Sequence, residues 1–184
     1  LGENPIVINN SKKISDVYEA LENKWHHYRI LVKEIKKNDD KKMIYFDGYL
    51  PEIPPEIFTL KRLKYLSLSN SGLKRLPSEI YQLENLESLD ITDAEINHLP
   101  RDILSLKKLR RVNFDANKFT DFPEVLLDHP SISDISINNN FITHIKPILD
   151  DVVKNEKITS FSCANNPLED FDEEMFRGGL SFIK

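Results

Sequence analysis

The hydrophobic residues of the chain recur in a unit of about 23 residues. Leu76-Pro77 is followed by Leu99-Pro100 at an offset of 23 residues, and the same offset leads forward to Phe122-Pro123 and back to Ile53-Pro54. A second set of apolar residues opens each unit, at its first, fourth, sixth and eleventh positions. Such coincidence at one period indicates an internal repeat. The second set is Leu63, Leu66, Leu68, Leu73, Leu86, Leu89, Ile91, Ile96, Leu109, Val112, Phe114, Phe119, Ile132, Ile135, Ile137, Ile142, Ile158, Phe161, Cys163 and Leu168.

Each unit has two halves with different apolar spacing. In the first half apolar and polar residues alternate, as around Leu66 and Leu68, which predicts a β-strand with one buried face. In the second half a proline interrupts the strand pattern, and apolar residues at three-residue steps predict a loose helical return. One coil cannot bury both apolar rows alone. The coils must therefore stack and join these rows into one continuous core.

Two units depart from this pattern. The unit from 132 to 157 has 26 residues, and its Pro147 and Lys154 suit the two ends of a true short α-helix over 146–154. A degenerate first unit begins near residue 40. We expect Ile44 and Phe46 to be exposed beside its strand. Its apolar row is then expected to be Met43, Tyr45, Leu50 and Ile53.

The spacing LxxLxLxxNxL followed by LPxxI resembles the leucine-rich repeat family, in its 23-residue class. The resemblance covers roughly residues 40–180. It implies an α/β fold, a right-handed solenoid with a parallel β-sheet on its concave face and short helical or extended returns on its convex face. It also implies that the chain binds another protein and is not an enzyme, but it indicates little about the identity of that partner.

The resemblance assigns a structural role to the ninth position of the unit, where an Asn side chain bonds backbone groups of the turn. Asn117, Asn140 and Asn166 keep this residue. Ser71 is expected to replace it in part, whereas Ala94 offers no polar atom. The asparagine ladder is therefore expected to break in the second full copy.

The 184 residues divide into three parts. Residues 1–38 contain an amphipathic helix, at about 14–36, that is expected to cap the apolar layer of the first coil. Residues 39–180 form the solenoid of about six coils, and residues 181–184 form a C-terminal cap or the start of a further coil. We expect a monomer, but a dimer through the helix stays open because several residues fit a heptad. These are Tyr18, Leu21, Trp25, Tyr28, Val32 and Ile35.

The composition of the chain argues against several classes of function. The net charge of -5 offers no broad positive potential to attract nucleic acid. No apolar run approaches the ~18 residues of a membrane span. No phosphate-binding glycine loop, zinc-protease motif or cysteine pair occurs, so we expect no enzymatic activity and no cofactor. The single cysteine, Cys163, fits a reducing compartment such as the cytoplasm. A secreted protein or effector stays open because the sequence does not begin with Met.

Two sets of stacked residues suggest other chemistry. The thirteenth positions form a column in which two histidines flank an aspartate and could ligate a metal, but a fourth ligand is not evident. We prefer a mixed-charge turn column and expect no metal. Basic residues near the strand starts face acidic residues of the next coil, which favours opposite-charge columns over an anion-binding patch. The first column is Arg75, His98, Asp121 and His144, and the charge columns are Lys61–Glu84–Lys107 and Lys64–Glu87–Arg110.

The outward residues around the strand leucines are the candidate binding site, because they line the concave face. This face is polar, and Arg111 is the only basic residue among its aspartates, so the carboxylates are expected to be incompletely paired. We expect a protein or peptide partner, and the acidic side chains favour a basic one. The predicted site is Tyr65, Ser67, Asp90, Thr92, Asp93, Arg111, Asn113, Asp115, Asp134, Ser136 and Asn138.

Three alternatives remain open. The concave face is solvated surface and the partner binds at an edge or at the cap, or the chain recognises the substrate of a larger effector or signalling enzyme. In the third alternative it is a purely structural or adhesive module.

Overall fold

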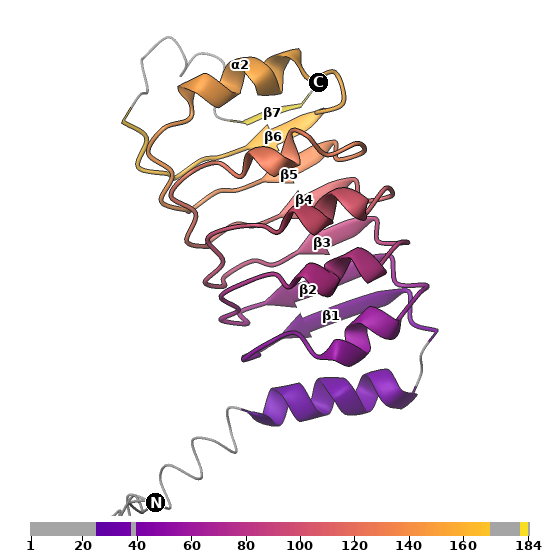
Figure 1. Cartoon of the computed structure of the whole chain (residues 1–184). Helices are drawn as coiled ribbons and strands as arrows, with labels where there is room; N and C mark the ends of the chain where they lie inside the picture. Colours follow the sequence, from indigo (N-terminus) through magenta and orange to yellow (C-terminus); the bar gives the residue numbers. More distant parts are fainter. Residues whose placement is uncertain (1–24, 38–39, 170–180, 184) are drawn as a thin grey trace, which may run out of the picture.

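The computed structural model describes residues 25–37, 40–169 and 181–183. A single seven-stranded sheet runs through it, with the strands side by side in sequence order (Figure 1). The first six strands pair in parallel, and β7 pairs antiparallel with β6. The strands are β1 (Met43–Asp47), β2 (Tyr65–Ser69), β3 (Ser88–Asp90), β4 (Arg111–Asn113), β5 (Asp134–Ser136), β6 (Ser160–Ser162) and β7 (Ser181–Ile183).

Short helices connect the strands on the opposite side of the molecule from the sheet (Figure 1). Pro77, Pro100 and Pro123 cap the N-termini of three 3₁₀ helices, where a missing N–H costs nothing. The long unit forms the α-helix that its sequence predicts. The connecting helices are η1 (Pro55–Thr59), η2 (Ser78–Gln82), η3 (Arg101–Ser105), η4 (Glu124–Leu126) and α2 (Lys146–Lys154).

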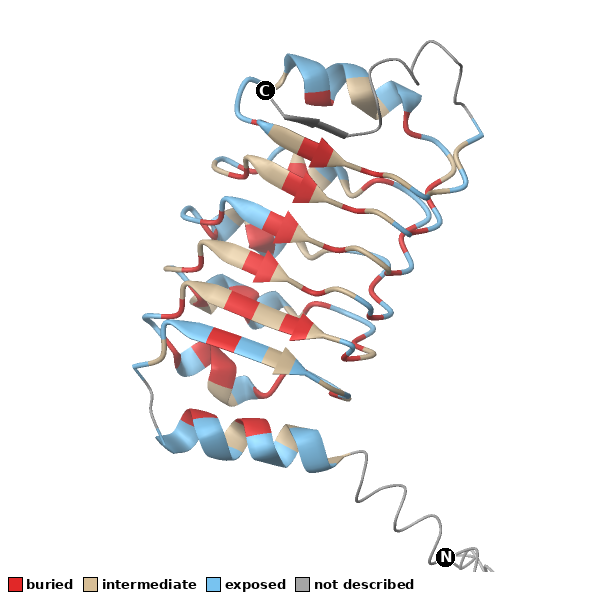
Figure 2. Cartoon of the chain, turned by 180° about the vertical axis from the view of Figure 1, so that it is seen from behind, coloured by how far each residue is buried: buried red, intermediate tan, exposed pale blue. Residues whose placement is uncertain are grey.

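The core lies between the sheet and these helices. The strand register places Leu66, Leu89 and Val112 side by side, and each is buried. In Figure 2 every strand of the parallel sheet carries buried residues next to half-buried or exposed ones, as a sheet with one covered face requires. Burial of each such side chain stabilises the folded state by roughly 1.5–3 kcal/mol, compared with leaving it exposed to water. The repeat register predicted from the sequence is confirmed for these coils.

An asparagine ladder joins the coils at their turns. The Oδ1 atom of Asn117 accepts the N–H of Ile96 at 3.0 Å, and its Nδ2 donates to the carbonyl oxygen of Ile91 at 2.7 Å. Both Ile96 and Ile91 belong to the preceding coil. Asn140 and Asn166 make the equivalent bonds one and two coils further on. The expected role of these three residues is confirmed.

The ladder is missing from two coils rather than one. Ala94 is buried and brings no polar atom, as expected. Ser71 is also fully buried, but its hydroxyl has no hydrogen-bond partner in the part of the chain that the structure describes. The expectation that Ser71 partly replaces asparagine is therefore wrong. Its side chain is one carbonyl group shorter, and it does not reach the backbone atoms that the amide group bonds.

The strand of the first coil differs from its predicted register by one residue. Ile44 pairs with Leu66 and Phe46 with Leu68, so Ile44 is buried and Phe46 packs against the core. Met43 and Tyr45 are the exposed residues of β1, at 50% and 69%. The four consecutive side chains from Met43 to Phe46 are all apolar, so alternation did not identify the buried face. A slip of one residue exchanges the two faces of a strand.

The N-terminal helix packs on the first coil. The structure describes it over residues 25–37, and Leu31 and Ile35 are buried in the same core as the strands. Tyr28 packs against this core. The helix therefore caps the apolar layer that β1 and η1 would otherwise leave open, as the sequence predicts (Figure 1). Residues 14–24 of the predicted helix lie outside the described residues.

Candidate partner-binding surface

The outward side chains of the sheet form columns that cross the strands. We call this outer surface of β1 to β6 the concave face. Its columns contain the predicted residues Tyr65, Ser67, Asp90, Arg111, Asn113, Asp134 and Ser136. One column is Met43, Tyr65, Ser88, Arg111, Asp134 and Ser160, and the next is Tyr45, Ser67, Asp90, Asn113, Ser136 and Ser162.

The remaining predicted residues follow the strands. Thr92, Asp115 and Asn138 lie two residues beyond the second column, and all three are half-buried. Asp93 is exposed at the turn in a left-handed conformation with φ of 54°. Asn70, Ala116, Asn139 and Asn165 hold the equivalent positions of four other coils in the same conformation. Asp93 therefore belongs to the turn edge of the surface rather than to the sheet.

Asp115 is tied into the structure. Its Oδ1 atom accepts hydrogen bonds from the hydroxyl of Ser136 and the backbone N–H of Asn138, both at 2.7 Å. Its Oδ2 atom accepts the side-chain amide of Asn138 at 3.1 Å. The Oδ1 atom of Asn138 in turn accepts the hydroxyl of Ser162 at 2.6 Å and the N–H of Ala164 at 2.7 Å. The hydrogen bonds of Asp115 are therefore made within the chain, although none of its partners here is a basic side chain. The repeat spacing predicted that Asp115 lies on the concave face, but it did not predict these hydrogen bonds.

Asp90 and Asp134 differ from Asp115. The carboxylate of Asp90 accepts only hydroxyl groups, from Thr92 at 2.6 Å and Ser67 at 3.5 Å. The carboxylate of Asp134 accepts hydroxyls from Ser133 at 3.1 Å and Thr159 at 3.4 Å. Neither makes a salt bridge within the described part of the chain, although Arg111 is the strand neighbour of Asp134. These two carboxylates therefore keep an uncompensated negative charge on the concave face.

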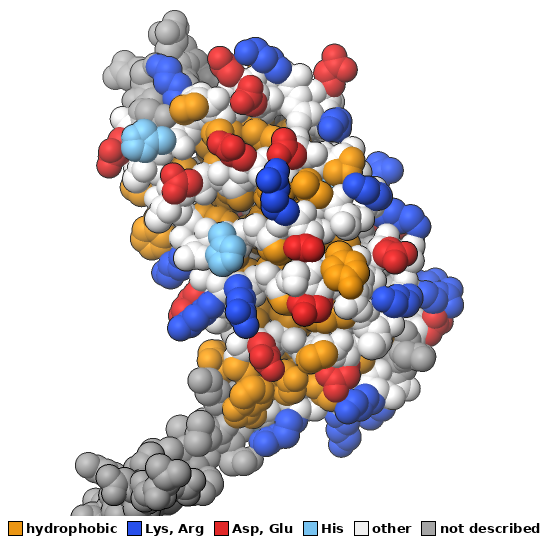
Figure 3. All heavy atoms as spheres, viewed as in Figure 1, with side chains coloured by type: hydrophobic (Ala, Val, Ile, Leu, Met, Phe, Trp, Pro, Cys, Tyr) orange, Lys and Arg blue, Asp and Glu red, His pale blue; other side chains and the backbone are white. Residues whose placement is uncertain are grey.

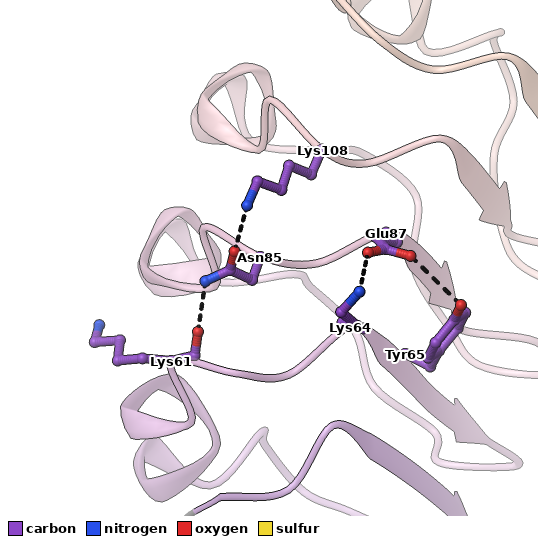
Figure 4. A network of polar contacts seen from close by, with 6 residues as sticks. All are labelled: Lys61, Lys64, Tyr65, Asn85, Glu87 and Lys108. Carbon is purple, nitrogen blue, oxygen red and sulfur yellow. Dashed lines mark hydrogen bonds and ion pairs between the residues drawn. The ribbon is translucent and has the colours of Figure 1, made fainter.

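Charged and amide side chains cross the coils along the edge where the strands begin (Figure 4). The Nζ atom of Lys64 lies 2.6 Å from Glu87, which also accepts the hydroxyl of Tyr65 at 3.4 Å. The hydrogen bond between Lys64 and Glu87 raises the pKa of Lys64 and lowers the pKa of Glu87. Asn85 links the coils on either side of its own, since it donates to the carbonyl of Lys61 and accepts from Lys108.

One of the two predicted charge columns forms. Lys64 and Glu87 pair as expected, and Arg110 lies near enough to lower the pKa of Glu87 further. The column Lys61–Glu84–Lys107 is wrong. Lys61 and Lys107 instead donate to carbonyl groups at the ends of the 3₁₀ helices, at Phe58, Gln82 and Leu104. Exposed charges gain little from pairing, so carbonyl groups near these lysines are competitive partners.

On the opposite side of the molecule, which carries the connecting helices, neither positive nor negative charge predominates (Figure 3). Acidic and basic side chains are interspersed over it, and hydrophobic side chains gather toward its N-terminal end (Figure 3). A pocket of about 580 Å³ lies in that region, between the first two coils, with Tyr49 packed over Gly72 and both signs of charge at its rim. Its mixed rim favours no particular ligand.

The histidines and the aspartate of the thirteenth-position column bond residues next to them in the chain rather than one another. The side chains of His98, Asp121 and His144 each bond a chain neighbour, at Asn97, Thr120 and Thr143. Within the described residues no three His, Cys, Asp or Glu side chains gather in a metal-binding cluster. Cys163 is fully buried, and burial raises the pKa of its thiol to about 12, which makes it a poor nucleophile.

His129 has a structural function that its sequence position did not reveal. It is buried, and its Nδ1 atom accepts the N–H groups of Ser131 and Ile132 at 3.3 Å. Its Nε2 atom must therefore carry the proton, which it donates to the carbonyl of Ile103 at 3.0 Å. Burial lowers the pKa of His129. Because Ile103 belongs to the preceding coil, His129 bridges two coils.

The fold and this surface define a repeat solenoid that presents one curved sheet. The chain belongs to the leucine-rich repeat family, because the family model described as a leucine-rich repeat region matches residues 55–150. No curated protein matches the chain at a significant level. No described helix is long and apolar enough to cross a membrane.

Solved structures show the same fold. A leucine-rich repeat protein of Leptospira interrogans has a TM-score of 0.61 and 23% identity, with 79% of this chain and 42% of that chain covered. An internalin of Listeria monocytogenes has a TM-score of 0.53 and 21% identity, covering 67% and 34%. A plant peptide hormone receptor in complex with RGF2 has a TM-score of 0.54 and 16% identity, covering 68% and 21%. The chain thus spans less than half the length of each.

Proposed function

We propose that the chain is a scaffold whose concave face binds an extended, basic segment of another protein. Membership in the leucine-rich repeat family supports a protein-binding scaffold in general. The sheet supplies a rigid surface, because every strand from β1 to β6 is hydrogen-bonded to its neighbours and backed by the core. Side chains held on such a surface lose little further entropy when a partner binds.

The observation that carries the basic partner is the difference between the aspartates. Asp115 is satisfied within the chain, whereas Asp90 and Asp134 accept hydroxyl groups alone. The two carboxylates are two strands apart, on β3 and β5, and two residues apart along the strand direction, so roughly 12 Å separates them. Two Lys or Arg side chains of an extended segment match this separation. Their attraction to an incompletely paired acidic surface increases the association rate.

A second candidate is the recognition part of a larger effector or signalling enzyme. The observation in its favour is length, since this chain spans 42%, 34% and 21% of the three solved structures named above. Recognition by the concave face is common to both candidates. The two differ in whether a catalytic domain acts on what this face holds, which the full-length gene would decide.

The test is a comparison of two variants with the same net charge. Partners are captured from a cell lysate with the purified chain and identified by mass spectrometry. Asp90→Asn with Asp134→Asn removes the proposed site. Asp102→Asn with Asp128→Asn, two exposed residues on the other side of the molecule, serves as the matched control. We expect a partner that the control retains and the site variant loses. A partner that both variants retain equally would exclude the acidic concave face.

A further inference from the structure

Three exposed apolar residues gather where the N-terminal helix meets the sheet. Ile30 of the helix is 45% exposed, and Met43 and Tyr45 of β1 are 50% and 69% exposed. All three line one hollow of about 310 Å³. We call this hollow the apolar corner. Its floor is formed by core residues of the helix and strand, and Glu34 and Lys41 lie at its rim. The floor residues are Leu31, Ile35, Ile44 and Phe46.

The clustering of these three residues around one hollow distinguishes them from apolar side chains that are exposed singly. Single apolar side chains on a surface need no explanation, whereas a cluster around a hollow is typical of binding sites. The other large exposed apolar residues in the described part of the chain, Tyr49, Tyr81, Phe141 and Val153, lie on different segments. Phe141, for example, is covered by the ammonium group of Lys118 at 4.9 Å from its ring centre. Tyr81 lies on η2, on the far side of the molecule from the sheet.

The apolar corner is continuous with the acidic part of the concave face. Tyr45, Ser67 and Asp90 are successive members of one column across β1, β2 and β3. Tyr65 lies beside Met43 in the next column and extends the apolar surface toward Asp90. Two strand spacings separate Tyr45 from Asp90, about 10 Å. An extended chain advances about 3.3 Å per residue, so three residues span this distance.

We propose that the apolar corner holds an aliphatic or aromatic side chain of the partner segment, and that a Lys or Arg two to four residues away along that segment contacts Asp90. This inference rests on the proposed function and adds a direction to it, since the apolar end of the segment must lie over β1 and its basic end over β3. The occupant is an extended peptide of another protein. Its chemistry follows from the continuity of an apolar hollow with an unpaired carboxylate.

A selection from a phage-displayed library of random peptides tests the proposal with the full chain. Selected peptides are synthesised with a fluorescent label and titrated by fluorescence polarisation. Met43→Ser with Tyr45→Ser should weaken binding about tenfold or more, because burial of an apolar side chain contributes that much. Tyr81→Ser with Val153→Ser, which removes two exposed apolar residues elsewhere, should leave binding unchanged. Replacement of the peptide's apolar residue by Ser should have little further effect on the Met43→Ser, Tyr45→Ser variant.

The outcomes separate the two proposals. If the corner variant binds selected peptides as wild type does while Asp90→Asn with Asp134→Asn weakens them, the apolar corner is not the anchor and the proposed function stands. If neither variant matters, or no peptide is selected, both proposals fail. Light scattering of wild type and the corner variant covers the remaining occupant. A dimer that the corner variant abolishes would assign the corner to a second copy of the chain and overturn the inference.

Discussion

The carboxylate of Asp115 accepts the backbone N–H of Asn138, one coil further along the solenoid, at 2.7 Å. The same carboxylate accepts a hydroxyl and an amide group from that coil. An acidic residue on the concave face thus stabilises the fold, although its place in the repeat is like that of a binding residue. The distinction between Asp115 and the nearby Asp90 underlies the binding proposal.

Asp115→Asn should lower the free energy of unfolding by about 1.5–3 kcal/mol, the usual contribution of hydrogen bonds to a charged group. The amide can replace one acceptor oxygen but presents a donor to the Ser136–Asn138 pair at the other. Urea denaturation followed by circular dichroism measures the change. Asp90→Asn is the control and should shift stability by less than ~0.5 kcal/mol. Equal effects of the two substitutions would contradict the division between structural and free carboxylates.

Ala94→Asn should raise the free energy of unfolding by about 1 kcal/mol, because it restores a missing member of the asparagine ladder. In the adjacent coil the Asn117 side chain bonds the N–H of Ile96 and the carbonyl of Ile91. The equivalent groups around Ala94 are those of Leu73 and Leu68. Thermal melting of Ala94→Asn and of the reverse change, Asn117→Ala, measures the ladder from both directions. A destabilised Ala94→Asn variant together with an unaffected Asn117→Ala variant would show that the ladder contributes nothing.

The regular coils were predictable because their leucines alternate with polar residues. Around Leu89 the neighbours Ser88 and Asp90 are polar, so only one register buries the apolar row. In β1 the neighbours of Ile44 are Met43 and Tyr45, and hydrophobicity alone cannot decide which set faces the core. The packed position of Leu31 in the N-terminal helix decides it, since that contact exists only in three dimensions.

The sequence predicted which residues form the columns of the site, but it did not predict which of their carboxylates are hydrogen-bonded within the chain. Periodicity placed Asp90 and Asp115 on the same face, because both lie outward from the core. Whether a carboxylate is satisfied depends on the turn conformation of the next coil, where the Asn138 N–H points at Asp115. The apolar corner was missed for the same reason as the register of β1. His129 gave no signal, because its partners are backbone atoms of other residues.

The stability of the fold should decrease on acidification through His129. Burial holds its pKa in the folded chain below the ordinary 6.5 that the unfolded chain keeps. Well above pH 6.5 this residue is neutral in both states, and its contribution to stability does not depend on pH. As the pH falls below 6.5 the unfolded chain binds a proton that the folded chain resists, so unfolding becomes more favourable. Lys107 and Lys157 oppose protonation as well.

Urea denaturation at a series of pH values measures this effect. The control is His129→Gln, whose amide can donate to Ile103 and accept from Ser131 without titrating. We expect the difference between wild type and this variant to grow in the variant's favour as the pH falls below 6.5. Parallel pH profiles for the two proteins would mean that His129 does not titrate with unfolding.

Leu31→Asp with Ile35→Asp should destabilise the chain severely and promote aggregation, because both side chains close the core at its N-terminal end. Ile30→Asp, on the exposed side of the same helix, should leave the melting temperature within a few degrees of wild type. Differential scanning calorimetry and light scattering measure the two effects. A soluble double variant with an unchanged melting temperature would show that the helix is not a cap.

The most direct test of the binding proposal is the salt dependence of association. A partner or selected peptide is measured by surface plasmon resonance at several salt concentrations, with wild type, with Asp90→Asn plus Asp134→Asn, and with the charge-matched Asp102→Asn plus Asp128→Asn. The concave-face variant should lose affinity mainly through a slower on-rate and show a shallower salt dependence, while the control should follow wild type. Unchanged affinity and an unchanged salt dependence in the concave-face variant would contradict the proposal.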